Sequence, residues 1–249
     1  MKLLKKLVLG TYSNLLVGIS TLLWSTLGLL FCLLPPAWKL KGHNLCAHYW
    51  GTWILRGSGI SVRVVGSENL KPGTQYMVIA NHRSFLDIYI LLTASGLHCR
   101  MVAKKELTKI PVFGLLLRYS DSIVIDRQNR EQAIATMRQR GKLLKEKGLS
   151  IVVFPEGTRS TGRKELGNFK KGAFILAAQL GLPILPVTIV GAGELQPKGA
   201  MAIKPGSITL KIDAPLMPPD YAKPADIAPL AEQARKTIEH NLQTFTAAP

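Results

Sequence analysis

Short apolar runs alternate with helical segments from residue 60 onward, and this alternation constrains the fold more than any other feature of the chain. The β-like runs predict strands at 60–64, 76–80, 99–103, 122–126, 150–154, 184–190 and 207–212. The helical patterns predict helices at 84–95, 111–119, 129–147, 171–180 and 227–245. Strands that alternate with helices favour an α/β fold, with a mainly parallel mixed sheet flanked by helices and its loops gathered at one edge.

The N-terminal region has a different composition. Leu7–Trp38 contains no charged residue, and Leu15–Leu34 is rich in Leu and long enough to cross a bilayer. Pro35–Pro36 ends this helix, and the next segment mixes aromatic with basic residues, which suits the lipid headgroup region. We therefore expect a membrane-associated two-helix motif at 1–58 and an α/β domain at 59–249.

Two arrangements of this apolar segment stay open. Basic residues lie on both sides of it, so the positive-inside rule selects no orientation. A spanning helix would separate the N-terminal lysines from the rest of the chain, whereas two helices dipping into one leaflet would not. We favour the dipping arrangement. A signal peptide fits less well, because the apolar run is too long and no small-residue cleavage site follows.

The charge of the chain predicts anionic partners. Lys and Arg number 32 and Asp and Glu 15, which gives a net charge of +17. Nucleic acid is not expected, because zinc-ligand spacing, an aromatic RNA-binding pattern and a basic repeat are all absent from the sequence. An anionic phospholipid membrane fits the charge. Three cysteines without C-x-x-C spacing indicate reduced thiols, so we expect the cytosolic face of a membrane (the inner membrane in a bacterium).

Two residues of the run 81–87 carry the candidate chemistry. A neutral imidazole, His82, can accept a proton from a hydroxyl, and the carboxylate of Asp87 can orient the ring and stabilise its charged form. Ser84-x-x-Asp87 also fits a helix capping box, and the two interpretations are compatible. Five residues turn through about 140° on an ideal helix, so His82 must lie in the loop before the helix.

Several motifs occur in the order found in glycerolipid acyltransferases, a family that the chain resembles over roughly residues 60–215. They are the H-x-x-x-x-D run at 82–87 and the segments Ala103–Leu107, Ile110–Gly114, Ile125–Arg127, Phe154–Ser160 and Pro183–Val187. The resemblance implies transfer of a fatty acyl group from acyl-CoA or acyl carrier protein to the sn-2 hydroxyl of lysophosphatidic acid, giving phosphatidic acid. The acyl donor is then a co-substrate, and no bound cofactor is expected.

The resemblance also implies roles for individual residues. His82 is the general base, Asp87 orients it, and Lys104 meets an oxyanion or a phosphate. The phosphorylated acceptor is bound by the block Glu156, Gly157, Thr158 and Arg159.

Arg127 resembles a second phosphate contact of the family. The chain departs from the family pattern at 120–122, where a glycine often occurs, and the choice between Arg127 and Arg130 therefore stays open. Pro183 and Pro186 are expected to shape a loop and an apolar acyl channel.

Other chemistries receive less support from the sequence. No G-x-S-x-G elbow is present for a serine hydrolase, and no histidine shows a metal-ligand spacing. We expect direct transfer without a metal. Two alternatives stay open: an acyltransferase for another acceptor, such as glycerol-3-phosphate or a lyso-aminolipid, and a non-catalytic basic lipid-binding module.

Overall fold

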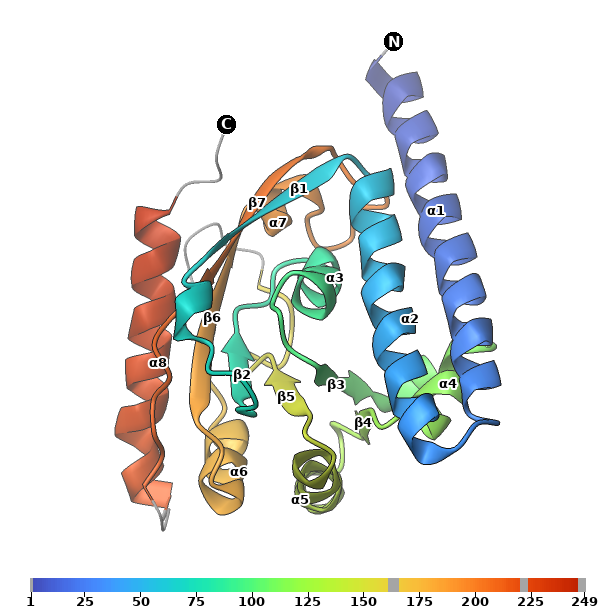
Figure 1. Cartoon of the computed structure of the whole chain (residues 1–249). Helices are drawn as coiled ribbons and strands as arrows, with labels where there is room; N and C mark the ends of the chain where they lie inside the picture. The colour runs from blue at the N-terminus through green and yellow to red at the C-terminus, as the bar shows by residue number, and fades with distance from the viewer. Residues whose placement is uncertain (1, 161–165, 220–223, 246–249) are drawn as a thin grey trace.

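The computed structural model describes residues 2–160, 166–219 and 224–245 as an α/β fold (Figure 1). Within these residues a seven-stranded sheet forms the centre of the molecule. The strands are β1 (Ile60–Val65), β2 (Met77–Ala80), β3 (Cys99–Lys104), β4 (Ile123–Ile125), β5 (Ser150–Val153), β6 (Ile184–Val190) and β7 (Gly206–Ile212). The α-helices are α1 (Lys2–Phe31), α2 (Pro36–Gly57), α3 (Leu86–Thr93), α4 (Phe113–Tyr119), α5 (Arg130–Glu146), α6 (Gly172–Leu180), α7 (Ala192–Leu195) and α8 (Pro224–Thr244).

The sheet is mixed and mainly parallel, as the alternation of strands and helices predicts. Its strand order is β1-β7-β6-β2-β5-β3-β4. The five strands from β6 to β4 run parallel to one another, whereas β7 is antiparallel to β6 and parallel to β1. The predicted fold class is confirmed.

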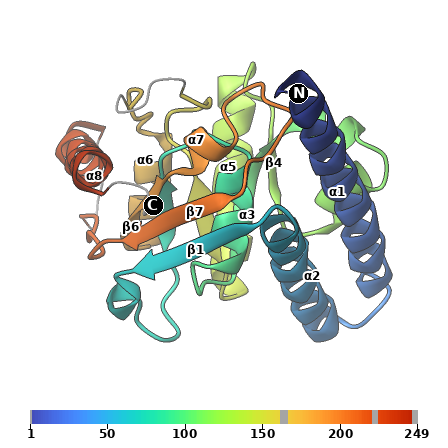
Figure 2. The ribbon, with the colours of Figure 1, turned by 90° about the horizontal axis from the view of Figure 1, so that it is seen from above.

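The two faces of the sheet bury separate cores because side chains alternate along a strand. Val78 and Ala80 of β2 contribute to the core beneath α2 and α3, whereas Met77 and Ile79 contribute to the core beneath α6 and α8. A strand buried on both faces reads as a continuous apolar run, which is what β2 shows. Figure 2 shows helices on both sides of the sheet.

Helices α1 and α2 form an antiparallel hairpin that lies against the sheet domain (Figure 1). In the first half of α1, the Ser13 hydroxyl accepts a hydrogen bond from the Ile203 backbone N–H at 3.0 Å. Near the C-terminal end of α1, Gly28 allows close approach, because a Cβ there would lie 2.9 Å from Leu116. The helix therefore contacts the domain both in its first half and near its C-terminal end.

The loop after β2 is attached to the neighbouring strand by one buried side chain. Asn81 is fully buried, its amide donates to the Ile189 carbonyl at 2.9 Å, and its carbonyl accepts from the Ile189 N–H at 2.8 Å. These two bonds extend the pairing of β2 with β6 by one residue beyond Ala80.

Replacing Asn81 by Ala should destabilise the fold, because the Ile189 N–H and carbonyl would both be buried without a partner. We expect a loss of about 2–6 kcal/mol in the free energy of unfolding, at about 1–3 kcal/mol for each group. Urea unfolding of the detergent-solubilised protein measures it. Ser61→Ala, at an exposed site, is the control. Equal stability of the two variants would contradict the assigned role.

Candidate active site

The predicted site residues follow the carboxyl ends of adjacent parallel strands. His82 comes after β2, Glu156 after β5 and Arg127 after β4, and Lys104 is the last residue of β3. Carboxyl ends of parallel strands meet at one edge of a sheet, where α/β proteins place their ligand sites. Tertiary structure therefore brings together residues that lie far apart in the sequence.

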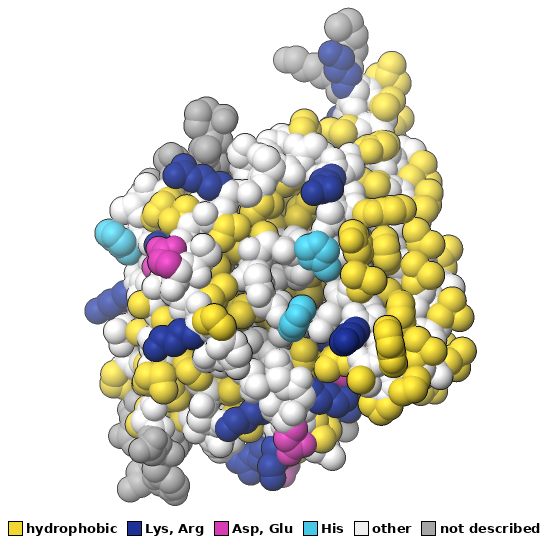
Figure 3. Space-filling view, viewed as in Figure 1, with side chains coloured by type: hydrophobic (Ala, Val, Ile, Leu, Met, Phe, Trp, Pro, Cys, Tyr) yellow, Lys and Arg dark blue, Asp and Glu magenta, His cyan; other side chains and the backbone are white. Residues whose placement is uncertain are grey.

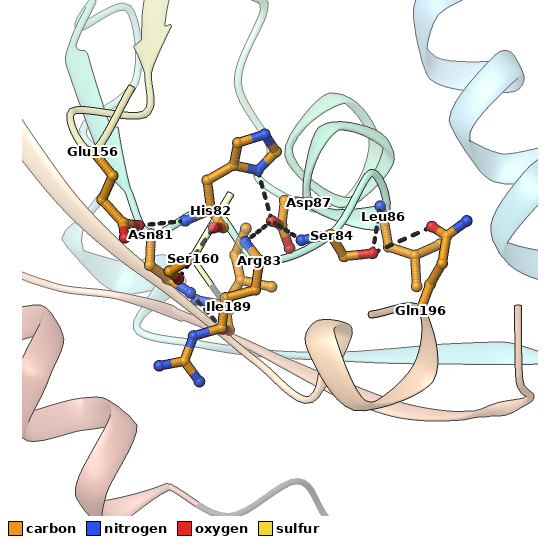
Figure 4. Close-up of polar contacts among 10 residues, drawn as sticks. All are labelled: Asn81, His82, Arg83, Ser84, Leu86, Asp87, Glu156, Ser160, Ile189 and Gln196. Atoms are coloured by element: carbon orange, nitrogen blue, oxygen red, sulfur yellow. Dashed lines mark hydrogen bonds and ion pairs between the residues drawn. The ribbon is translucent and has the colours of Figure 1, made fainter. Parts of the chain in front are cut away.

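The His82 ring is held in one orientation by Asp87. Its Nδ1 lies 2.9 Å from Asp87 Oδ2, and the Asp87 carboxylate is fully buried. An ionised carboxylate only accepts hydrogen bonds, so Nδ1 carries the proton and Nε2 keeps a free lone pair. In Figure 4 the outer ring nitrogen points away from Asp87. This arrangement leaves Nε2 able to accept a proton from a hydroxyl.

The structure bears out the capping interpretation of Ser84 and Asp87 in part: the two side chains bind backbone N–H groups at the start of α3, but the N-cap residue of the helix is Phe85. Ser84 Oγ accepts from the Leu86 N–H at 3.1 Å, and Asp87 Oδ2 accepts from the Ser84 N–H at 2.8 Å. The same oxygen also accepts from the Arg83 N–H at 2.7 Å. Backbone N–H groups of the loop before α3 therefore fix the Asp87 carboxylate, while the same oxygen orients the His82 ring. His82 lies in the loop before α3, as predicted.

The segment Phe154–Ser160 makes three contacts with His82. Glu156 Oε1 accepts from the His82 N–H at 2.9 Å, and the Ser160 N–H donates to the His82 carbonyl at 2.9 Å (Figure 4). The His82 ring stacks on Phe154 with the ring centroids 4.0 Å apart. Because both backbone groups and one ring face are engaged, this segment determines where the imidazole lies.

Both carboxylate oxygens of Glu156 accept hydrogen bonds from backbone N–H groups. Its Oε2 accepts from the Gly167 N–H at 3.0 Å, and the residue is buried. A carboxylate repels a phosphate, so this geometry favours a positioning role over direct contact with the acceptor. Acceptor binding by Glu156 stays a prediction.

Cationic side chains surround the site. Arg127 Nη1 donates to the Gly157 carbonyl at 2.6 Å, and the Arg159 guanidinium lies 4.0 Å from the centre of the Phe85 ring. Lys104 is half exposed, with its ammonium 3.9 Å from a Glu106 carboxylate oxygen. Three cations at one edge make this part of the surface positively charged.

Gly157 has a backbone conformation that favours glycine. Its φ is +75°, in the left-handed region that glycine adopts without a steric penalty. A Cβ at this position would lie 2.9 Å from the Lys170 ammonium. A side chain here would strain the turn that brings the Gly157 carbonyl to Arg127.

A cavity of about 610 Å³ begins at this edge and continues under the helical hairpin. Its polar mouth includes His82, Lys104, Arg127, Gly157, Thr158 and Arg159. Its deeper walls are largely apolar and include Trp24, Trp50, Leu92, Met101, Phe113 and Leu116. Asp87 and Glu156 lie behind the lining and support it. The side chain of Arg130 lies outside the described residues.

Two features were not anticipated from the sequence. Lys198 lines the cavity, and its ammonium donates to the Arg159 carbonyl at 3.2 Å, although no motif includes it. The expectation that Pro183 and Pro186 shape the acyl channel is wrong, because neither lines this cavity. Pro186 instead lies inside strand β6, where it is buried between β2 and β7. A strand position directs it into the sheet rather than into a loop.

Known proteins show the same architecture and sequence pattern. The Acyltransferase family model matches residues 61–190. The 1-acyl-sn-glycerol-3-phosphate acyltransferase of Limnanthes alba is 35% identical over 207 residues, which cover 83% of this chain and 72% of that protein. The protein of that name from Saccharomyces cerevisiae is 35% identical over 194 residues, 77% of this chain and 63% of that protein.

A solved structure has the same fold over nearly the whole chain. The crystal structure of the 1-acyl-sn-glycerophosphate (LPA) acyltransferase PlsC from Thermotoga maritima matches with a TM-score of 0.81 and 28% identity, covering 98% of this chain and 97% of that one. Fold, motifs and relatives together define an α/β enzyme that transfers acyl groups. The chain belongs to the Acyltransferase family, which confirms the resemblance predicted from the motifs.

Replacing Asp87 by Asn should lower kcat by about 10²–10⁴, because an amide cannot stabilise the imidazolium that forms when His82 accepts a proton. KM should change little, since Asp87 does not line the cavity. Release of the free thiol from an acyl-CoA reports the rate. Asp213→Asn, at the end of β7, is the control. A kcat within threefold of the wild type would contradict the role of Asp87.

Proposed function

We propose that this protein transfers a fatty acyl group from acyl-CoA or acyl carrier protein to the sn-2 hydroxyl of 1-acyl-glycerol-3-phosphate, giving phosphatidic acid. The observation that carries the proposal is the position of the His82–Asp87 pair at the cationic mouth of an apolar cavity. Relatives named for this activity support the choice of acceptor.

The chemistry follows from the position of His82 Nε2. The sn-2 oxygen attacks the thioester carbonyl carbon while its proton passes to Nε2, and Asp87 stabilises the resulting imidazolium. The carbon–sulfur bond of the tetrahedral intermediate then breaks. The thiolate leaves and takes the proton from the imidazolium, so products are phosphatidic acid and the free thiol. The transfer is direct and forms no acyl-enzyme.

Arg127 and Arg159 are proposed to hold the acceptor phosphate. Both line the mouth of the cavity beside His82, and a guanidinium can bind a phosphate through two parallel hydrogen bonds. Lys104 at the end of β3 is the proposed donor to the carbonyl oxyanion, a contribution of about 10²–10³ in rate for such groups. Gly157 and Thr158 complete the acceptor site.

The deeper part of the cavity suits a fatty acyl chain. Its walls are mainly Leu, Phe, Met and Trp side chains that exclude water from a hydrocarbon. No metal enters the proposed mechanism. Among the described residues, no three His, Cys, Asp or Glu side chains lie close enough together to hold a metal ion.

The proposal is tested by offering the purified protein an acyl-CoA with a panel of acceptors and measuring product masses. Phosphatidic acid should form from lysophosphatidic acid, and His82→Ala should abolish it because no base remains. His48→Ala, an exposed histidine of α2 outside the active-site cavity, is the control.

Two outcomes would contradict the proposed transfer to lysophosphatidic acid. A preference for an acceptor without phosphate would remove the roles of Arg127 and Arg159. Full activity of His82→Ala would favour the non-catalytic lipid-binding alternative.

We also propose that the hairpin dips into the cytosolic leaflet of an anionic membrane. By length and composition alone, Leu4–Phe31 could cross a bilayer. However, α1 contacts the domain in its first half through Ser13 and near its C-terminal end through Gly28, so a full crossing would draw the domain into the lipid. Figure 3 shows apolar side chains gathered over the hairpin. The exposed ones include Leu15, Ile19, Leu22, Leu30, Leu33, Leu34, Trp38 and Trp53.

The double variant Leu22→Asp/Leu33→Asp should reduce binding to vesicles that contain anionic phospholipid by at least about tenfold, because each charge would have to enter the apolar layer. Co-sedimentation of protein with vesicles measures the binding. Leu143→Asp changes an exposed leucine on α5, away from the hairpin, and should bind as the wild type does. Equal loss in both proteins would contradict a membrane contact through the hairpin.

A further inference from the structure

The apolar cavity has a polar end. Arg100 of β3 and His43 of α2 both line it and are 6% and 5% exposed. Strand β3 runs from Cys99 to Lys104, so Arg100 lies about 13 Å from Lys104 at about 3.3 Å per residue. The two polar groups therefore lie at the end of the cavity opposite its catalytic mouth.

Arg100 retains a donor for which no described residue provides an acceptor. Its Nη1 donates to the Asn44 side-chain carbonyl at 2.8 Å and to the Cys99 carbonyl at 3.0 Å. Its Nη2 is buried and makes no hydrogen bond to any described residue. Asn44 directly follows His43 on α2, and the charge of Arg100 acts on the His43 ring, so the guanidinium lies near His43.

His43 retains an acceptor. Its Nε2 lies 3.0 Å from the Gly28 carbonyl, which can only accept, so Nε2 carries the proton. Burial lowers the pKa of His43 more than the Gly28 carbonyl raises it, and the charge of Arg100 lowers it further. The neutral ring presents a lone pair at Nδ1, which is buried and has no hydrogen-bond partner in the described part of the chain.

A hydrocarbon chain end would satisfy neither group. A polar atom buried without a partner is costly, so an acyl chain with a plain methyl end leaves two uncompensated atoms at this end of the cavity. One N–H donor beside one nitrogen acceptor is complementary to a hydroxyl group, which accepts one hydrogen bond and donates another.

We propose that the far end of the cavity binds an O–H group, which accepts a hydrogen bond from Arg100 Nη2 and donates one to His43 Nδ1. Two sources supply this chemistry: a hydroxyl near the methyl end of the acyl chain, or a water molecule that caps a plain chain. The inference rests on the proposed function for the identity of the chain as a fatty acyl group. Its test uses binding and does not require turnover.

The test measures dissociation constants of fatty acids from C10 to C18, plain and ω-hydroxylated, by titration calorimetry in detergent. At the length that fills the cavity, the wild type should bind the hydroxylated chain at least as tightly as the plain one. In His43→Leu the affinity for the hydroxylated chain should fall by at least about tenfold relative to the affinity for the plain chain, because the hydroxyl of the chain lacks an acceptor.

Two further variants control for folding. His48→Leu makes the same change at an exposed site of α2 outside this cavity and should keep the wild-type ratio. His43→Gln supplies an amide that can donate to Gly28 and accept from the hydroxyl. It should therefore keep the wild-type ratio of the two dissociation constants, for the hydroxylated and the plain chain, and it serves as the folded variant if His43→Leu does not fold.

The water source gives a different result. The wild type then binds plain chains more tightly at every length, and His43→Leu prefers a longer plain chain because no water occupies the end of the cavity. The O–H site would be overturned if folded His43→Leu kept both the wild-type ratio of dissociation constants for hydroxylated and plain chains and the wild-type preference for chain length. Acyl transfer to lysophosphatidic acid is measured on the same proteins. If transfer occurs but His43→Leu leaves the binding ratios unchanged, only the O–H site is refuted. If the expected change in binding is seen but no transfer occurs, only the proposed function is refuted.

Discussion

The position of one imidazole depends on contacts between two loops at the same edge of the sheet. The loop after β5 holds the backbone N–H and carbonyl of His82 and stacks against its ring, while helix α3 supplies the carboxylate that orients it. Neighbouring parallel strands β2 and β5 bring these loops together. Because two elements fix the ring from different directions, its free nitrogen stays directed into the cavity without help from substrate.

The same architecture explains why the cavity has a charged mouth and an apolar interior. Its mouth lies at the carboxyl ends of the strands, where backbone turns and cationic side chains collect, as with Arg127 and Gly157. Its interior lies between the sheet and the helical hairpin, whose inward-facing side chains are mainly apolar. A substrate with an anionic headgroup and a hydrocarbon chain matches this division. The hairpin thus forms part of the cavity wall and, by our proposal, also contacts the lipid from which the acceptor comes.

Much of this could be predicted from the sequence because the relevant patterns are local. Strand and helix periodicities and the Ser84-x-x-Asp87 pattern each depend on a few neighbouring residues. The contact between Lys198 and Arg159 left no such trace, since an exposed lysine in a loop has no periodicity or spacing. Pro186 lies within the strand predicted at 184–190, but its expected place beside an acyl channel was wrong: only the pairing of β6 with β2 and β7 shows that it is buried inside the sheet.

The sequence by itself determined the α/β class, the apolar N-terminal segment and the set of candidate site residues, because these follow from residue type and spacing. Only the tertiary structure decided that both Glu156 oxygens bind backbone N–H groups, and that Arg100 and His43 both line an apolar cavity. These arrangements bring together residues from separate strands, helices and loops. Their geometry is set by the order and direction of strands in the sheet, which no local pattern encodes.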